Sequence, residues 1–465
     1  GNRPRSPLFR RGGRRDASLE ATQAAPAPES PAASLYSLHP RELWRFMKTQ
    51  KASFWLICLY LFLEYVRPQS IYDALAGPPY TRIALILCVI CFFLEGKEFR
   101  FRTPADITLG VFTAVVLVSS LAAWKPEASW AKMPDYLSWV LIYLLIANVV
   151  TTEKRWLVFV LGFMLWSFKM SQHGTRSWAE DGFAFRDWGT TGAPGFFQNS
   201  GEFGIQMCVF LPMIVFFITG LGRHWSRLTK IVFWGIAVTA VTGIVASSSR
   251  GALIGMAAVA LWLLMKTRYR FRALVGIALF TAFVVAILPR EQKDRLNAMG
   301  KDDDKTSVSR KEYWKHGREI IATYPVLGIG YENWADYHET NYGVRALPHN
   351  IFIQAGAELG YTGLAAFGAM IVATFWVNRK TRKIAKTLPD GRFLHDSAHG
   401  LDGALVGFLV SGSFVTVLYY PFFWINLALT VALYNSALDS RAAAARGIAG
   451  EEPEIPGRPL LRGVA

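Results

Sequence analysis

The chain has 465 residues, of which 52% are hydrophobic, and its formal net charge is +16 at pH 7. The hydrophobic residues come in blocks of about 15–20 residues, the length at which a helix crosses the hydrocarbon core of a bilayer. This pattern excludes a soluble globular protein and predicts an all-α polytopic membrane protein. Because the excess basic residues lie in short loops and tails, the charge indicates membrane topology and not nucleic-acid binding.

In chain order, residues 1–50 are expected to be a disordered, basic cytoplasmic N-terminus, because they are rich in Arg, Pro, Ala and Ser. The first apolar block begins near Ala52 and is expected to act as a signal anchor. A transmembrane domain is expected over residues 51–440 and a cytoplasmic tail over 441–465. About twelve crossings are expected, near residues 52–66, 83–95, 106–124, 133–150, 156–170, 203–220, 231–247, 251–266, 272–289, 351–377, 403–419 and 421–438.

The charges of the loop residues support this number of crossings. If the basic N-terminus is cytoplasmic, every second loop should also be cytoplasmic and basic. Each of those loops does carry basic residues, among them Lys97, Lys154, Arg227, Arg268 and Arg382. Both termini are therefore expected inside the cell. Two long segments, near 171–202 and 290–350, are expected on the outer face, and function is expected to reside there.

Two arginines are expected at helix starts on that face. Arg250 ends the segment "VASSSRG" and opens the crossing at 251–266. Arg310 is expected in the first turn of a helix in "TSVSRKEYWKHGREIIATYP", where Ser309 and Glu312 fit a capping box. A guanidinium beside the free N–H groups of a helix start favours a phosphate ligand. Taken singly, Arg310 is equally consistent with a solvated arginine, and Arg250 with contact to lipid headgroups.

One histidine is expected at a third helix start. His349 follows Pro348 and precedes the apolar block that begins at Ile351. An imidazole has an ordinary pKa near 6.5 and accepts a proton at neutral pH. Alone, it also fits a hydrogen-bonded interfacial histidine. Together with Arg250 and Arg310 it outlines a metal-free glycosyl transfer from a lipid diphosphate, with His349 as the base.

The outer segment near 171–202 contains "FRDWGTTGAPGFFQNSGEFG". Its mixture of Gly and aromatic residues fits either sugar stacking or an ordinary re-entrant loop. Arg186 is a further candidate for the diphosphate, and Asn199 is a weaker candidate for substrate binding. Asp302, Asp303 and Asp304 could bind a divalent cation, but the flanking lysines favour a solvated loop tip. No metal and no other cofactor is therefore expected.

The motifs "SSSRGALIG", "SRKEYWKHG", "PVLGIGYENW" and "HNIFIQAGAELGYTGL" follow one another in this chain. In this order, among many crossings, they resemble the bacterial O-antigen ligase and polymerase superfamily over roughly residues 50–440. The resemblance implies a fold similar to C-type glycosyltransferases, in which a large periplasmic loop at about 290–350 caps a cavity. It also implies a bacterial inner-membrane location and a periplasmic active site.

The resemblance further implies the chemistry. Arg250 and Arg310 would hold the diphosphate, His349 would be the general base, and Asn350 beside it is a weaker candidate contact. Members with ligase activity move O-antigen from undecaprenyl diphosphate to a sugar of lipid A–core, with inversion and without a metal. The second arginine is the least certain assignment, since Arg318 and Arg345 are alternatives to Arg310.

Three other functions remain open on the sequence. An O-antigen polymerase would use a second glycan lipid as acceptor, and a protein ligase would use a Ser or Thr hydroxyl. Both share the visible chemistry with the ligase. A transporter is less favoured, because no internal repeat is evident and the charged residues lie at the outer rim. The glycan, the acceptor and the oligomeric state are not encoded in any recognisable motif.

Overall fold

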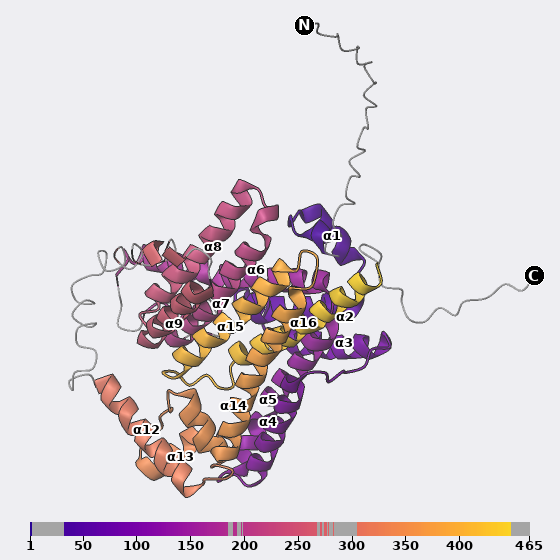
Figure 1. The fold of residues 1–465 in the computed structure, drawn as a ribbon. Coiled ribbons are helices and arrows are strands. Elements are labelled where there is room, and N and C mark those ends of the chain that lie inside the picture. The colour runs from indigo at the N-terminus through magenta and orange to yellow at the C-terminus, as the bar shows by residue number, and fades with distance from the viewer. Residues whose placement is uncertain are drawn as a thin grey trace, which may run out of the picture.

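The computed structural model describes residues 32–184, 189–192, 197, 199–266 and 305–447, with Gly1 and a few positions between 270 and 282. Within these residues the chain is helical and contains no strand (Figure 1). The helices are η1 (Ala33–Leu35), α1 (Pro40–Lys48), α2 (Ala52–Tyr65), η2 (Pro68–Ser70), η3 (Asp73–Leu75), α3 (Tyr80–Leu94), α4 (Pro104–Leu121), α5 (Pro126–Val149), α6 (Glu153–Glu180), α7 (Ser200–Leu221), η4 (Gly222–His224), α8 (Arg227–Ala246), α9 (Arg250–Lys266), α12 (Lys305–Thr323), α13 (Trp334–Tyr342), α14 (Ile351–Ala385), α15 (Arg392–Gly412) and α16 (Pro421–Ala445).

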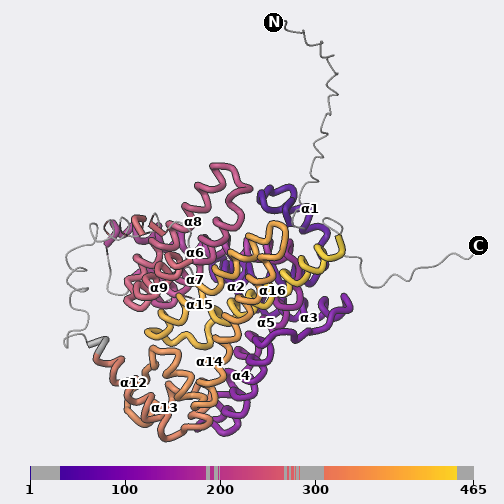
Figure 2. The backbone as a smooth tube through the Cα atoms, in the orientation of Figure 1, coloured from indigo at the N-terminus to yellow at the C-terminus, as the bar shows by residue number. Residues whose placement is uncertain are grey.

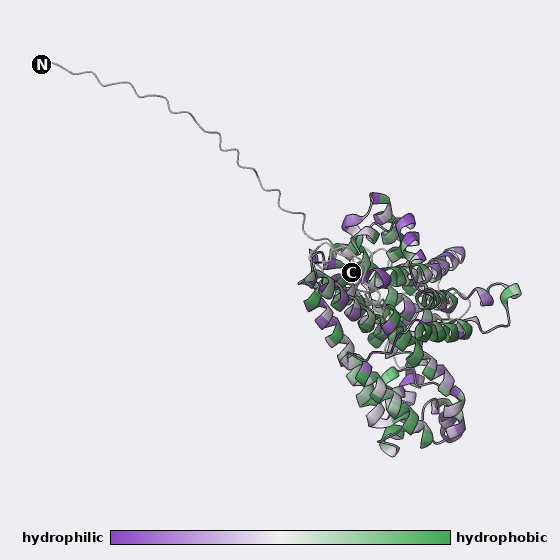
Figure 3. Ribbon diagram, turned by 90° about the vertical axis from the view of Figure 1, so that its right-hand side faces the viewer, coloured by the Kyte–Doolittle hydropathy of each residue, from purple (hydrophilic) through white to green (hydrophobic). Residues whose placement is uncertain are grey.

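The helical, membrane-type architecture is confirmed. Among the described residues, five helices are long and apolar enough to cross a bilayer. They are Pro104–Leu121, Ser200–His224, Arg227–Ala246, Ile351–Ala385 and Pro421–Ala445. In Figure 3 hydrophobic residues dominate the bundle, and hydrophilic residues are more frequent in the lower lobe, which holds α12 and α13. The number of about twelve crossings stays a prediction, and the block at 272–289 lies outside the described helices.

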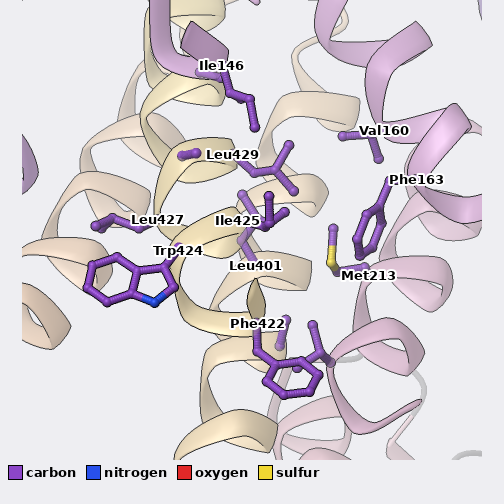
Figure 4. Packing of buried hydrophobic residues seen from close by; sticks show 14 of the residues in the cluster. Ile146, Val160, Phe163, Met213, Leu401, Phe422, Trp424, Ile425, Leu427 and Leu429 are labelled. Atoms are coloured by element: carbon purple, nitrogen blue, oxygen red, sulfur yellow. The ribbon is translucent and has the colours of Figure 1, made fainter. Parts of the chain in front are cut away.

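Large apolar side chains fill the interior of the bundle. Trp424 and Phe422 of α16 are buried, as are Phe163 of α6 and Met213 of α7. Figure 4 shows these side chains in the same cluster as Leu401 of α15. Close packing of this kind fixes the relative positions of the helices, because interiors leave few voids to absorb a shift. The helix ends that carry the polar residues are thereby fixed as well.

Polar contacts gather alternate helix ends at one end of the bundle. Glu153, at the start of α6, accepts hydrogen bonds from the hydroxyls of Tyr36 and Ser440, the latter near the end of α16. The indole of Trp225, which precedes α8, donates to the backbone oxygen of Tyr36. In Figure 2 this end lies opposite the lobe of α12 and α13. The arrangement fits the alternation expected from the basic loops.

Helix α14 is broken at Gly360, where φ is 68° and ψ is −169°. A break exposes backbone groups that must find other partners in an apolar environment. The segment "PVLGIG" supplies them: Ile329 N–H donates to the oxygen of Ala357, and Gly330 N–H donates to that of Glu358, both at 2.9 Å. Tyr361 N–H donates in turn to the oxygen of Pro325 at 2.7 Å. The outer loop and α14 are therefore locked together.

The structure differs from the expected boundaries at several places. Residues 33–35 and 40–48 are helical inside the N-terminus that was expected to be disordered, because Tyr36 is buried and Pro40 starts α1. Helix α6 continues to Glu180, so the outer segment near 171–202 is helical in its first part. Helix α15 runs from Arg392 to Gly412 and not over 403–419, since polar residues in its first turns concealed its start.

Candidate active site

The turn at 413–420, between α15 and α16, is the meeting point of several helix starts. A Cβ placed on Gly201 of α7 would lie 3.3 Å from Val415 Cγ2. One placed on Gly251 of α9 would lie 2.8 Å from Phe414 Cβ. The backbone N–H of His349 donates to Thr416 Oγ1 at 2.9 Å. The starts of α7, α9 and α14 therefore converge on this turn, and the positive ends of their helix dipoles favour an anion there.

Arg250 is the first residue of α9, as the sequence predicted. Its side chain is half-buried. Ser249, just before it, lies against the start of α7, because its Oγ would be 3.7 Å from a Cβ on Gly201. The preceding residue, Ser248, has φ of 50°, which is uncommon for a residue other than glycine. The segment "SSSRG" thus forms a tight turn that presents Arg250 at the convergence of helix starts.

Arg310 lies on the same side, but not where the sequence placed it. Helix α12 begins at Lys305, so Arg310 falls beyond the first turn and the expected capping box at Ser309 and Glu312 is wrong. The helix is nevertheless held against the site. The indole of Trp314, one turn further on, donates to the backbone oxygen of Pro348 at 3.0 Å and faces the ring of Phe414.

His349 is half-buried and lies between these arginine-bearing segments. Burial, with the positive charge of Arg310 as the second cause, lowers the pKa of His349 to about 4. The imidazole is therefore neutral at pH 7 and able to accept a proton, and Arg310 is close enough to act on it electrostatically. Its φ of 47° is an outlier for a residue other than glycine. Such strain persists where the surroundings impose it, often at functional sites.

The alternatives to Arg310 have other surroundings. Arg345 forms ion pairs with Asp336 at 2.5 Å and with Glu339 at 2.9 Å, so its guanidinium is engaged by carboxylates of α13. Arg318 is exposed on α12. Neither contributes to lowering the pKa of His349, whereas Arg310 does. Arg310 is therefore the better candidate for the second diphosphate ligand.

The two asparagines have structural roles. Asn350 caps α14, because its Oδ1 accepts from the N–H groups of Phe352 and Ile353 at 2.9 and 3.1 Å. Asn199 caps α7 by accepting from Gly201 N–H at 2.7 Å. In both residues the side-chain oxygen is already used, so a substrate contact would have to come from the amide nitrogen. Arg186 and the run Asp302–Asp304 lie outside the described residues.

Sequence reasoning missed a cavity of about 570 Å³ beside this region. The wall of the cavity includes Pro348, which precedes His349, and Thr416, which accepts the hydrogen bond from His349 N–H. Carboxylates in the wall include Glu202, Glu332 and Glu358. Glu202 accepts from the hydroxyl of Tyr420 at 2.9 Å, which ties α7 to the start of α16. In the described part of the chain, no cluster of three or more His, Cys, Asp or Glu side chains is arranged to hold a metal ion.

Residues 235–368 match a family model described as O-Antigen ligase. The matched segment runs from α8 into α14 and includes Arg250, Arg310 and His349. It also contains the "PVLGIG" loop that locks onto the broken part of α14. Among curated proteins, none matches this chain.

Proposed function

We propose, because residues 235–368 match a family model described as O-Antigen ligase, that this chain is an O-antigen ligase of the bacterial inner membrane. It would transfer O-antigen from undecaprenyl diphosphate to a sugar hydroxyl of lipid A–core on the periplasmic face. The transfer would be inverting and independent of metal. The observation that carries this proposal is the position of His349: its N–H is bonded to Thr416 in the turn where helix starts converge, and Trp314 of the Arg310 helix is bonded to the neighbouring Pro348.

In this reaction His349 takes the proton of the acceptor hydroxyl as its oxygen attacks the anomeric carbon of the donor sugar. A new glycosidic C–O bond forms, and the bond between that carbon and the phosphate oxygen breaks. The electron pair leaves with undecaprenyl diphosphate, while the proton stays on His349. Attack from the face opposite the leaving group inverts the anomeric centre. Base catalysis of this type accelerates a reaction by about 10²–10⁴-fold.

Arg250 and Arg310 would hold the diphosphate and stabilise the charge that grows as it departs. The converging helix starts add the positive ends of their dipoles. A bound diphosphate would also offset the effect of Arg310 on His349 and make the imidazole a stronger base. Base strength would therefore rise only when the donor is in place.

The test is transfer by the purified protein in detergent, with undecaprenyl-diphosphate O-antigen as donor, EDTA present and no nucleotide. Separate reactions contain lipid A–core, a second portion of glycan lipid, or a Ser- and Thr-containing acceptor protein. Glycosylated lipid A–core is the expected product. Longer lipid-linked chains would instead show a polymerase, and a glycosylated protein would show a protein ligase. Donor that is neither consumed nor transferred in any reaction would contradict glycosyl transfer.

A further inference from the structure

The cavity of about 570 Å³ is walled by segments that are distant in sequence. It is bounded by the end of α2, the start of α3, the middle of α5, the start of α7, the loop before α13, the first turns of α14 and the turn before α16. Glu332 projects from the loop before α13, where its φ is 57°. The loop is held in place because Asn333 accepts from Lys125 N–H at 2.8 Å and donates to Ser129 Oγ at 2.7 Å.

The wall of this cavity carries both carboxyl groups and cations. Its carboxylates are Glu64, Asp135, Glu202, Glu332 and Glu358, and its cations are Arg67, Arg82 and Lys132. Two of the cations are paired within the wall, since Arg67 lies 3.6 Å from Glu64 and Arg82 lies 3.6 Å from Asp135. Burial raises the pKa of Glu332, with Lys132 opposing that rise. A carboxyl group whose pKa is raised is more readily protonated and can then donate a hydrogen bond to a sugar hydroxyl.

The deep wall offers groups that suit hydroxyls. Gln354 of α14 is 4% exposed, and its Nε2 donates to Glu358 at 3.5 Å. Its Oε1 has no hydrogen-bond partner among the described residues, although it is buried at the cavity wall. A buried acceptor without a partner is costly unless a ligand or water supplies a donor. Aromatic rings of Trp139, Tyr419 and Tyr420 stand in the same wall, and such rings pack against the C–H faces of sugars.

We infer that this cavity binds a neutral, hydroxyl-rich saccharide through Gln354, Glu332 and Glu358, and so places a sugar hydroxyl beside His349. Contact with Pro348 and Thr416 puts the cavity next to the peptide of His349. The inference rests on the proposed glycosyl transfer and extends it to the recognition of the sugar. The saccharide comes either from the acceptor or from the glycan of the donor.

The first experiment measures binding without turnover, by titration calorimetry on the full chain in detergent. The probes are lipid-free core oligosaccharide, with and without its phosphate groups, and lipid-free O-antigen oligosaccharide. The test variant is Gln354→Leu, which keeps the size of the side chain and removes its amide. The matched control is Gln206→Leu, because Gln206 is also fully buried with an Oε1 that lacks a partner among the described residues, yet does not line the cavity. Thermal unfolding of each variant verifies folding.

A saccharide site predicts that one neutral oligosaccharide binds, that Gln354→Leu weakens it at least tenfold, and that Gln206→Leu leaves it unchanged. Binding of the core oligosaccharide identifies the acceptor, and binding of the O-antigen oligosaccharide identifies the donor glycan. Equal affinity in the wild type and in a folded Gln354→Leu, or no binding of any probe, would overturn the inference.

Kinetics separate this inference from the proposed function. In the acceptor case, Gln354→Leu raises the KM for lipid A–core and leaves hydrolysis of the donor by water unchanged. In the donor case, the KM for the donor rises. Transfer with both KM values unchanged in Gln354→Leu would sustain the ligase and refute the saccharide cavity. Oligosaccharide binding that Gln354→Leu abolishes, in a protein that transfers nothing, would sustain the cavity and refute the ligase.

Discussion

The backbone N–H of His349 donates a hydrogen bond of 2.9 Å to the side-chain hydroxyl of Thr416. The candidate base is thereby tied to the turn at 413–420, which also contacts the starts of α7 and α9. Since His349 has φ of 47°, this contact helps to hold it in a backbone conformation that it would not favour alone.

Replacement of Thr416 by Val is expected to lower kcat about tenfold, because the His349 N–H loses its acceptor and the imidazole shifts from its productive position. Thr416→Ser keeps the hydroxyl and should restore most of the activity. A merely structural role would instead lower the unfolding temperature of Thr416→Val and leave its kcat unchanged. The measurement is the steady-state kcat for transfer, compared with the unfolding temperature of each variant.

Arg310→Ala is expected to lower kcat/KM for the donor by about 10–100-fold, the worth of a charged hydrogen bond. Arg345→Ala is the matched control, because that guanidinium is engaged by Asp336 and Glu339 on α13. It should change kcat/KM less than threefold. If Arg345→Ala had the larger effect in a folded protein, the assignment of the diphosphate to Arg310 would be wrong.

The dependence of kcat/KM on pH should report His349. Since only the neutral imidazole accepts a proton, activity should stay level on acidification from pH 7 and fall as the pH passes through about 4, its lowered pKa. Arg310→Gln removes one cause of the lowering, so the acidic limb should move to higher pH while remaining below the ordinary value of about 6.5. If the acidic limb lay at the same pH in Arg310→Gln as in the wild type, Arg310 would not be a cause of the lowered pKa of His349.

The sequence predicted the helical class, the start of α9 at Arg250 and the start of α14 beside His349, because these depend on apolar runs and local capping. It missed the start of α12, since a polar helix has no apolar block to mark its limits. The cavity was also missed. Its wall draws Glu332, Gln354 and Tyr419 from separate segments, and no spacing in the sequence shows that they meet. Nothing in the sequence indicated that Asn350, a weaker candidate for a substrate contact, also caps α14.

Gly360→Ala tests the lock between α14 and the outer loop. The backbone there occupies a region that is essentially restricted to glycine, and a Cβ would collide with the carbonyl oxygen of Val326. We expect a loss of unfolding free energy of about 3 kcal/mol or more. Gly368→Ala in the same helix is the control, because a Cβ there meets nothing within 4 Å. Thermal or urea unfolding in detergent measures both; equal stability of the two variants would show that the break is not required.

The most direct test of the central claim is transfer of undecaprenyl-diphosphate O-antigen to lipid A–core by the wild type and by His349→Asn. Asparagine tolerates the positive φ of this position, so the variant should fold and still bind the donor. The account predicts product from the wild type in EDTA and a loss of at least about 10²-fold in His349→Asn. Wild-type transfer that persists undiminished in His349→Asn would contradict the role of His349 as the base.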